Sequence, residues 1–403
     1  MNNWENVRFE NAPIEIIDGD RGVNYPKQSD FMIRGHCLFL NAGNVTALGF
    51  DFSNCSFINE VKDKVLRKGK LSRNDIVLTT RGTVGNLAFY DERIPFENLR
   101  INSGMVIFRA DQSKIFPRYL YFLLRSNIFS EQVSAFSTGS AQPQLPIRDI
   151  KQIELPLPPL REQCLIAGIL GALDDKIELN RRMNATLEAM ARTVFQRWFV
   201  ENEAVGNWKV GKMGDIAENI RRGANPEDIE TDTPYIGLEH MPRGSIALSD
   251  WSNANEVVSN KFFFKQGEFL FGKLRPYFHK VGIAPLDGVC STDILVIVPK
   301  SSEWYGFVLG HISSVELINY TNAASTGTKM PRTNWSDIAR YEVAIPPIKI
   351  AKDYNVIFLL MAQQIRANIM QSRTLASLRD ALLPRLISGE IRIANERRGS
   401  EGD

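Results

Sequence analysis

Two stretches of the chain place apolar residues in alternating steps of four and three, the spacing of a heptad seam. The spacing runs through 156–202 and recurs in 344–391. A proline-rich step, 155–159 or 343–347, lies at the start of each stretch, and proline opens a helix but does not continue one. We therefore expect two long helices, each of which needs a partner for its apolar stripe.

The expected partner of each helix is the other one. Asn180 and Asn368 interrupt the two stripes at the same place, which suits a buried polar residue that fixes register. A core helix with an exposed Asn is the alternative. Some 40 residues would make a rod of about 60 Å. The residues expected to pair the helices are Ile166, Leu170, Leu173, Ile177, Asn180, Leu187, Phe358, Met361, Ile365, Asn368, Leu375 and Leu382.

The two helices belong to a longer internal repeat. Residues 137–200 align without a gap with residues 325–388 at an offset of 188, and 15 of the 64 positions are identical. The shared positions include Ser-Thr-Gly at 137–139 and Pro-Pro at 158–159. A repeat of this length indicates a chain built as two similar halves.

Each half begins with a globular region of mixed composition. Short apolar runs such as 75–78, 104–108, 268–271 and 293–298 read as strands between turn residues. A helical spacing follows near 117–129 and again near 304–320.

We therefore expect an α+β fold in which two α/β globular regions are separated by two long helices. The helices would pack as an antiparallel coiled coil, giving a pseudo-two-fold internal repeat. The predicted divisions are a first globular region 1–155, a first helix 156–202, a second globular region 203–343, a second helix 344–391, and a disordered charged tail 392–403.

The composition changes this picture little. The 403 residues are 44% hydrophobic and 23% charged, close to globular averages. No secretion signal and no membrane-length apolar run are visible, so we expect a cytoplasmic location. The four cysteines are scattered singly, which disfavours disulfides and zinc. A metal site at His36 and Cys37 is a minor alternative to small core cysteines.

The net charge of +2 hides two basic stretches. Residues 60–81 carry seven Lys or Arg against three acidic residues, and residues 257–280 carry five against one. The stretches lie at comparable places in the two halves, as contacts to nucleic acid would. A solvated surface explains either one alone about as well.

Catalytic motifs are weak in this sequence. Residues 206–212 spell G-x-x-x-x-G-K, but Met213 stands where a phosphate-binding loop needs a hydroxyl. Asp51 with Glu60-Val61-Lys62 fits a metal-dependent nuclease pattern only loosely. Methyl-donor, methyltransferase and hydrolase motifs are missing, which disfavours a self-sufficient restriction enzyme. The pattern is typical of a binding protein, not a catalyst.

Several motifs nevertheless carry a family resemblance. The first is Leu-Pro-Leu-Pro-Pro-Leu-Arg-Glu-Gln at 155–163, which continues through 166–184 to Phe-Gln-Arg-Trp-Phe at 195–199. Further matching stretches are 235–240, 272–277 with 288–293, and 386–391. Over nearly its whole length the chain resembles the specificity subunit of type I restriction-modification enzymes.

The resemblance implies a DNA-binding subunit of a host-defence system that is non-catalytic by itself. Each globular region would be a target recognition domain, and the helices would be the spacer. The expected partners are double-stranded DNA, two methyltransferase (M) subunits that methylate adenine at N6, and restriction/translocase (R) subunits, with no membrane. S-adenosylmethionine, ATP and Mg would bind the partner subunits, and this chain would hold no cofactor or metal.

Because the helices are alike and the globular regions diverge, we expect a bipartite, asymmetric DNA target. Loops that combine cations with small residues are the candidate contacts, although a Thr-Gly turn is often only a turn. A coiled-coil scaffold that binds proteins through its globular ends is the alternative function. The candidate DNA-binding residues are Arg81, Thr83, Thr138, Gly139, Gln142, Gln144, Lys273, Arg275, Tyr277, Lys280, Thr326, Lys329 and Arg332.

One departure from the repeat concerns the two helix starts. Leu-Arg-Glu-Gln at 160–163 becomes Ile-Lys-Ile-Ala at 348–351, which loses the acidic and amide residues. This puts in doubt whether both helix starts make the same subunit contact.

Overall fold

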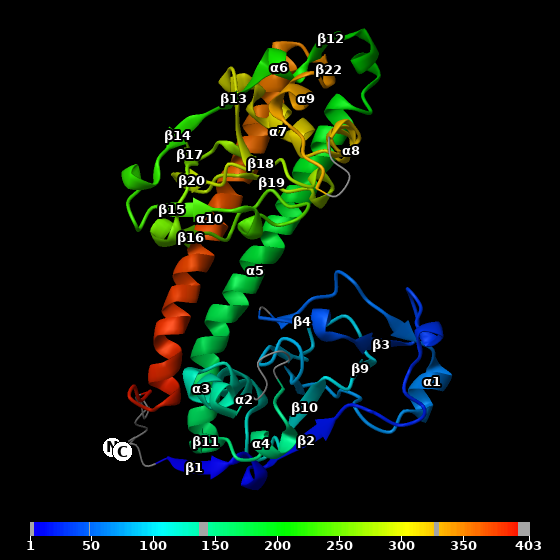
Figure 1. Ribbon diagram of the computed structural model, residues 1–403, viewed down its shortest axis with the longest axis vertical. Helices are drawn as coiled ribbons and strands as arrows, with labels where there is room; N and C mark the ends of the chain where they lie inside the picture. Colours follow the sequence, from blue (N-terminus) through cyan, green and yellow to red (C-terminus); the bar gives the residue numbers. More distant parts are fainter. Residues whose placement is uncertain (1–3, 48, 137–143, 326–329, 394–403) are drawn as a thin grey trace, which may run out of the picture. The chain divides into compact units, whose positions relative to one another are not determined.

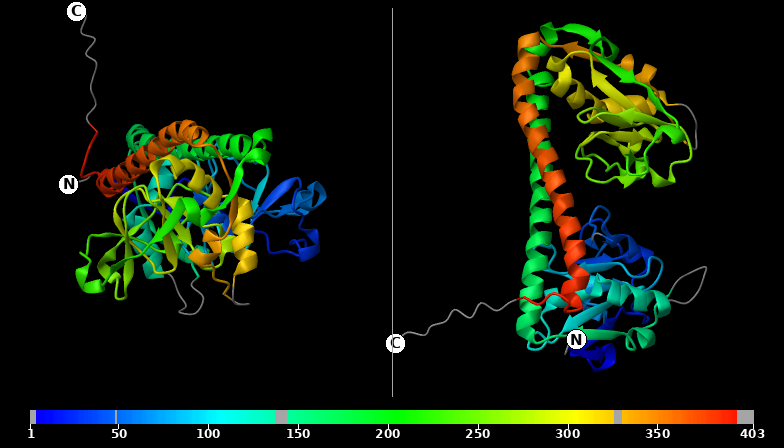
Figure 2. Two further views of the ribbon diagram at one scale, coloured as in Figure 1. Left: turned by 90° about the horizontal axis from the view of Figure 1, so that it is seen from above. Right: turned by 90° about the vertical axis from the view of Figure 1, so that its left-hand side faces the viewer.

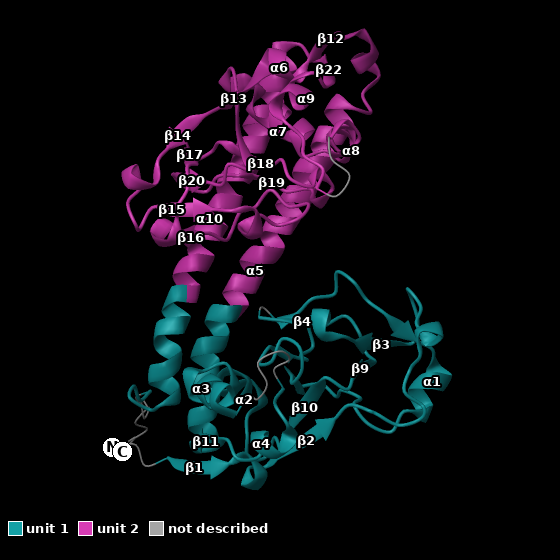
Figure 3. Cartoon of the chain, in the orientation of Figure 1, with its two compact units in different colours: residues 1–174, 377–403 teal, residues 175–376 magenta. Residues whose placement is uncertain are grey.

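The computed structural model describes residues 4–47, 49–136, 144–325 and 330–393. The chain divides into two compact units, one of residues 1–174 with 377–403 and one of residues 175–376 (Figure 3). Each unit contains a globular region and part of both long helices, α5 (Leu160–Phe199) and α10 (Ile348–Ile387).

The first unit is built on an antiparallel sheet of order β2-β10-β7-β8 (Figure 1). A smaller sheet has the order β6-β3-β9, in which β3 and β9 are parallel, and β1 pairs with β11. The strands are β1 (Glu5–Arg8), β2 (Ile14–Asp18), β3 (Cys37–Leu40), β4 (Val45–Thr46), β5 (Gly49–Phe50), β6 (Phe57–Ile58), β7 (Ile76–Thr79), β8 (Leu87–Phe89), β9 (Leu99–Ile101), β10 (Met105–Ala110) and β11 (Glu154–Leu157). The helices are α1 (Glu60–Val65), α2 (Pro117–Leu124), α3 (Asn127–Phe136) and α4 (Ile147–Ile150).

The main sheet of the first unit is buried on both faces. Ile76 and Leu78 of β7 join one apolar cluster with α2 and the ends of the long helices, whereas Val77 joins another with β3 and β9. Successive side chains of a strand point to opposite faces, so an unbroken apolar run suits this position.

The second unit repeats this plan with the sheet order β13-β21-β18-β19. A five-stranded sheet has the order β14-β17-β20-β15-β16, with β15 parallel to β20, and β12 pairs with β22. The strands are β12 (Lys209–Lys212), β13 (Ala217–Ile220), β14 (Arg222–Ala224), β15 (Pro234–Ile236), β16 (Ser252–Asn253), β17 (Lys261–Phe264), β18 (Phe269–Gly272), β19 (Val281–Ile283), β20 (Gly288–Cys290), β21 (Ile294–Pro299) and β22 (Glu342–Ile345). The helices are α6 (Met213–Ile216), α7 (Tyr305–Ile312), α8 (Val315–Ala324) and α9 (Trp335–Ala339). The repeat therefore extends to the topology of the globular regions, where the sequences diverge.

The two long helices pack antiparallel, as predicted, and they lie side by side in each unit (Figures 1 and 2). In the second unit, Asn184 bonds Asn368, and the Tyr354 hydroxyl donates to the Ala191 carbonyl at 3.3 Å, so rising numbers in α5 meet falling numbers in α10. In the first unit, Leu170 and Leu386 share one core cluster. All twelve residues predicted to pair the helices are buried or half-buried.

Each end of the helix pair is also part of a globular core. In the second unit, Phe199 of α5 and Tyr354 of α10 meet with ring centroids 5.0 Å apart, and Phe199 lies 4.9 Å from Phe307 of α7. The helices therefore do not form a free-standing rod, because the apolar stripe that pairs them continues into the packing of the domains.

The element boundaries differ from the prediction at the long helices and at two shorter helical stretches. The predicted helices 156–202 and 344–391 begin later, at Leu160 and Ile348, because the residues before the Pro-Pro step form β11 and β22. Pro156 is tolerated in β11 since the sheet has only two strands, each with an open edge.

The helical spacing near 117–129 covers two helices, α2 and α3, and that near 304–320 covers α7 and α8. Of the predicted tail 392–403, residues 394–403 lie outside the described residues. None of the described helices is long and apolar enough to span a membrane.

Candidate nucleic-acid interface

In the first unit, two predicted DNA-contacting segments come together. Arg81 forms an isolated antiparallel bridge with Gln144. Beside it, the Leu145 amide donates a hydrogen bond to the Thr80 carbonyl at 3.0 Å. The side chains of Arg81 and Gln144 are exposed. We call residues 80–86 with 144–145 the first loop pair.

The second unit joins the corresponding segments in the same way. Leu274 forms an isolated antiparallel bridge with Arg332, and the Thr333 amide donates to the Lys273 carbonyl at 3.0 Å. The Arg275 amide donates to the Pro331 carbonyl at 2.7 Å. We call residues 273–280 with 330–333 the second loop pair.

The two loop pairs occupy equivalent positions in the repeat. At the offset that relates the two halves, Arg332 is the counterpart of Gln144, and Thr333 is the counterpart of Leu145. Each pair lies where the loop after the third strand in the sheet order, β7 or β18, meets the segment before a short helix, α4 or α9. The fold therefore presents the same pair of loops twice with different side chains.

The backbone of the first loop pair depends on glycine. Gly82 and Gly85 have φ of 76° and 99°, a region that side-chain-bearing residues rarely adopt. Thr83 is exposed, and its carbonyl accepts a hydrogen bond from the Thr79 hydroxyl, which closes the turn. The predicted contacts Thr138, Gly139 and Gln142 lie outside the described residues.

In the second loop pair, Arg275 takes the unusual conformation. Its φ is 51°, and its side-chain Nε is buried without a hydrogen-bond partner among the described residues. The guanidinium lies 5.9 Å from the centroid of the Phe278 ring. Residues that hold a strained backbone often cluster at functional sites. Arg275 is therefore held by its surroundings instead of extending freely into water.

The remaining predicted contacts of this loop pair have different surroundings. Tyr277 is exposed, Lys273 is half-buried, and Arg332 is exposed with an ion pair to Asp293 at 3.5 Å. Lys280 points inward and donates to the Leu238 carbonyl, and burial lowers the pKa of its amine. Thr326 and Lys329 lie outside the described residues.

Arg243 is a cation of this site that the sequence analysis missed. Its guanidinium lies 3.9 Å from the centroid of the Phe278 ring, the ring that Arg275 also approaches. Strands β16, β17 and β18 separate Arg243 from Arg275 in the chain, so only the fold brings them to one ring. A lone Arg between Pro242 and Gly244 carries no signal of this contact in the sequence.

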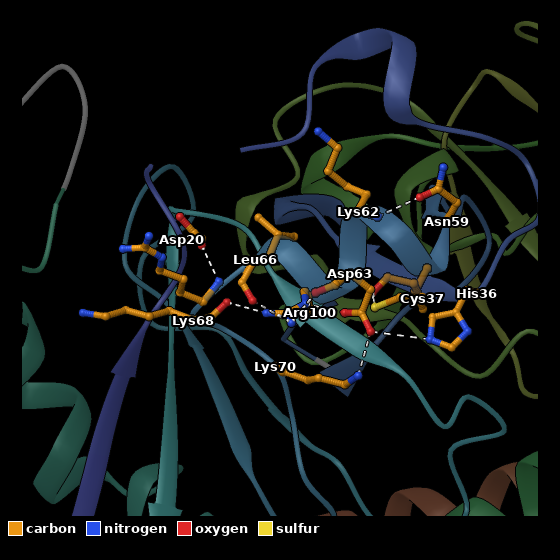
Figure 4. Close-up of polar contacts among 12 residues, drawn as sticks. Asp20, His36, Cys37, Asn59, Lys62, Asp63, Leu66, Lys68, Lys70 and Arg100 are labelled. Atoms are coloured by element: carbon orange, nitrogen blue, oxygen red, sulfur yellow. Dashed lines mark hydrogen bonds and ion pairs between the residues drawn. The ribbon is translucent and has the colours of Figure 1, made fainter. Parts of the chain in front are cut away.

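The basic stretch 60–81 is partly structural. Asp63 is nearly buried, and it pairs with Arg100 at 2.5 Å, Lys70 at 2.7 Å and His36 at 3.5 Å (Figure 4). Burial opposes its ionisation, but the bonds from Lys70 and Arg100 prevail and lower the pKa of Asp63. Lys62 is likewise paired, with Asp30 at 3.1 Å.

One cation of the second basic stretch, 257–280, is also bonded inside the protein. Lys261 is buried, and its amine donates to the carbonyl and hydroxyl oxygens of Ser259 at 2.8 and 2.7 Å. Burial lowers the pKa of this lysine. The exposed cations of the two basic stretches therefore include Arg67, Lys68 and Lys265 as well as those of the loop pairs.

The weaker chemical readings find no support in the geometry. The stretch 206–212 ends in strand β12, where Gly211 pairs with Val343, and so does not form a phosphate-binding loop. Cys37 lies buried in the core, and burial raises the pKa of its thiol to about 12. No three His, Cys, Asp or Glu residues gather as a metal site in the described part of the chain.

The comparisons with known proteins agree with the motifs. Residues 25–189 match the model of the type I restriction modification DNA specificity domain. The chain is 26% identical to the type I restriction enzyme MjaIX specificity subunit of Methanocaldococcus jannaschii over 80% of this chain and 78% of that protein. It is 23% identical to the HindI specificity subunit of Haemophilus influenzae over 93% of this chain and 98% of that protein.

Over most of its length the chain is similar to type I restriction specificity subunits. A crystal structure of a type I restriction-modification S subunit from M. genitalium shares the fold. Its TM-score is 0.59 at 16% sequence identity, and the match covers 96% of this chain and 97% of that one.

Within this fold, the departure at the helix starts has a structural explanation. Gln163 of α5 is buried; its side-chain oxygen accepts from the Phe116 amide at 2.8 Å, which holds the start of α2. In the second unit Ala351 replaces this glutamine, and Asn355, one turn later, accepts from the Gly306 amide of α7 at 3.0 Å. The amide therefore anchors each helix to its own globular region in both copies.

Proposed function

We propose that the chain is the DNA-reading subunit of a type I restriction-modification complex and recognises a bipartite, asymmetric target. Regions 1–155 and 203–343 would be the two target recognition domains. The repeated loop pair is the observation that carries this proposal, because one backbone arrangement presents Arg81 and Gln144 in one unit and Arg275 and Arg332 in the other. Equivalent loops with different side chains suit two unlike half-sites.

The chemistry of the loops fits base and phosphate contacts. An arginine such as Arg332 can bond guanine through two donors, and a glutamine such as Gln144 suits adenine. Lysines and backbone amides in glycine turns suit phosphates. The ion pair of Arg332 with Asp293 would hold the guanidinium in place before DNA arrives.

The helix pair would act as the spacer that sets the distance between the two half-sites on DNA. Each helix has 40 residues, which at 1.5 Å per residue amounts to about 60 Å. The antiparallel packing found in both units supports this role. A fixed spacer predicts a fixed number of unread base pairs between the half-sites.

The chain would also scaffold two methyltransferase (M) subunits and, through them, restriction (R) subunits. Val356 and Leu360 of α10 support a protein partner, since they lie one turn apart and each is 65% exposed. The chain would be non-catalytic by itself. S-adenosylmethionine, ATP and Mg would be bound by the partner subunits.

Gel-shift and methylation measurements on the assembled complex test the proposal. Adenine methylation mapped across the genome of cells that carry the chain and its M subunit should reveal one bipartite sequence with a fixed gap. The purified complex should then bind a duplex with that sequence more tightly than a random duplex at moderate salt. A protein scaffold without a DNA role would show equal binding to both duplexes and no methylated motif.

A further inference from the structure

A loop of the second globular region is held by both long helices. Residues 244–251, which we call the bracing loop, lie between the short 3-10 helix η6 (Leu238–His240) and β16 in the chain and contact α5 and α10 within the second unit. Glu188 and Arg192 of α5 bond its first half, and Arg373 of α10 bonds its second half.

Glu188 makes the main contact. It is 7% exposed, and its carboxylate accepts from the Ser245 hydroxyl at 2.7 Å and from the amides of Ile246 and Ala247 at 3.2 Å each. Burial raises the pKa of Glu188, although these three donors and the charge of Arg192 oppose the rise. A buried carboxylate with three donors fixes the backbone it bonds.

Arginines secure the two ends of the bracing loop. Arg192 donates to the Gly244 carbonyl at 3.3 Å. The Arg373 guanidinium lies 3.6 Å from the centroid of the Trp251 ring and donates to the Ser249 carbonyl at 3.5 Å. Stacking of this kind uses the flat guanidinium that lysine lacks.

The bracing loop in turn supports the second loop pair. The Gly244 amide donates to the His279 carbonyl at 2.8 Å, and the Ile283 amide donates to the Ile246 carbonyl at 3.0 Å. Next to Gly244, Arg243 covers the Phe278 ring that Arg275 also approaches. A short chain of bonds therefore leads from the Glu188 carboxylate to the loop that carries Arg275.

The repeat does not supply the same brace to the first unit. At the repeat offset, the counterparts of Glu188 and Arg192 are Ala376 and Asp380, and the counterpart of Arg373 is Ala185. The first unit instead ties its helices to α2 through Asp174, which pairs with Arg125 at 2.8 Å and Arg379 at 2.7 Å. The brace at Glu188 is specific to the second domain.

We propose that Glu188 is a positioning residue for the second target recognition domain. It holds the bracing loop on the helices, and the bracing loop holds residues 273–280 in the shape that reads the second half-site. This inference rests on the proposed function. It assigns a role in DNA recognition to a helix residue that does not touch the DNA-facing loops themselves.

The test is a pair of variants in the full chain, each assembled with its M subunit. Glu188→Gln keeps the shape of the side chain but turns an NH₂ donor toward one of the two backbone amides, because the Ile246 and Ala247 amides bond different carboxylate oxygens. Glu178→Gln, on the same helix, is the control because Glu178 is only half-buried and pairs with Arg181 and Arg182 of α5 itself. Binding is measured to duplexes that carry both mapped half-sites, or one mapped half-site and one scrambled.

We expect Glu188→Gln to weaken binding of the full site about tenfold, the cost of a lost buried hydrogen bond. Scrambling the second half-site should then reduce the DNA affinity of the variant much less than that of the wild type. Scrambling the first half-site should reduce the affinity of both proteins by the same factor. Glu178→Gln should behave as the wild type. A merely structural role would weaken both half-sites alike.

Equal losses at the two half-sites, or unchanged binding, would overturn the inference. If Glu188→Gln does not fold, Ser245→Ala decides in its place, because it removes only one donor to the carboxylate. The wild-type complex separates the two proposals. If it prefers no sequence, the proposed function fails; if it reads both half-sites and the variants do not change the second, only the role of Glu188 fails.

Discussion

At the scale of single residues, buried carboxylates organise both globular regions. Asp63 gathers two cations in the first unit, and Glu188 gathers backbone and hydroxyl donors in the second. The net shifts of their pKa values have opposite signs, because Asp63 faces cations whereas Glu188 faces mainly neutral dipoles. The same side-chain chemistry therefore responds to pH in opposite ways in the two units.

Asp63→Ala should destabilise the first unit strongly. The change leaves Arg100, 5% exposed, without its charged partner, and breaking a buried ion pair costs about 3–5 kcal/mol. Since the pKa of Asp63 is lowered, its stabilising contribution is present above pH about 4 and is lost as the pH falls through the lowered value. Urea unfolding at neutral and acid pH measures both effects.

The control for this change is Glu60→Ala, which removes an exposed ion pair with Lys64 and should alter stability little. If the two variants unfolded at the same urea concentration, Asp63 would not be a structural centre of the first unit.

Arg275→Ala should weaken binding of the specific duplex by about 1–3 kcal/mol if Arg275 contacts a base, with less effect on random DNA. Arg340→Ala is the matched control, since Arg340 is an exposed arginine of the same unit that bonds Asp337. A titration of both duplexes at moderate salt measures the difference. Unchanged affinity for the specific duplex would remove Arg275 from the interface.

At the scale of elements, the paired asparagines explain how the long helices find their register. Asn180 donates to the side chains of Gln371 and Ser372 at 2.9 and 3.1 Å, and Asn368 donates to Asn184 at 2.8 Å. The side-chain oxygen of Asn180 is buried without a partner among the described residues. A shift by one heptad would leave several of these groups unpaired, which disfavours other registers.

Asn180→Leu should stabilise the second unit by about 1 kcal/mol, because it removes the unpaired oxygen and adds apolar surface to the seam. Asn184→Leu should instead destabilise it by about 1–3 kcal/mol, because the nearly buried Asn368 amide loses its acceptor. Thermal unfolding of the two variants measures this contrast. Equal effects would show that the hydrogen bonds across the seam do not matter for stability.

The apolar spacing of the sequence did not predict every element boundary. The heptad spacing predicted that α5 and α10 pair, but it did not show that β11 and β22 precede them. Pro156 reads as a helix opener by itself, and its place in a strand depends on β1, which lies at the opposite end of the first globular region in the chain. The breaks between α2 and α3, and between α7 and α8, fall at Arg125–Ser126 and Ser313–Ser314, which the apolar spacing spans without a visible gap.

At the scale of the whole molecule, the proposed function makes the helix pair a ruler. Removing one heptad from each helix at facing positions, 177–183 and 365–371, should shorten the permitted gap in the DNA site. Seven residues span about 10 Å, or about three base pairs. Methylation mapping in cells that carry the shortened chain should report the same half-sequences with a smaller gap, and altered half-sequences would contradict the spacer role.

The candidate interface was predictable in part. The loops at Arg81 and Lys273–Tyr277 stood out because cations and glycines follow apolar strands in the sequence. Their union with Gln144 and Arg332 required the fold, since each bridge joins two segments that several other elements separate in the chain. Arg243 and Glu188 gave no signal at all, because an arginine in a turn and a glutamate on a helix are ordinary until their neighbours are known.

The sequence alone determined the duplicated plan, the two long helices and the family resemblance, because periodicity and repeated motifs can be recognised without coordinates. Tertiary structure decided which charges serve the fold and which remain for a ligand. Lys70 and Lys261 are indistinguishable from surface lysines in the sequence. In the structure Lys70 forms an ion pair with Asp63, and Lys261 donates a hydrogen bond to Ser259. The physical reason is that hydrogen bonding and desolvation depend on residues that are distant in the chain, and only folding brings those residues within bonding distance.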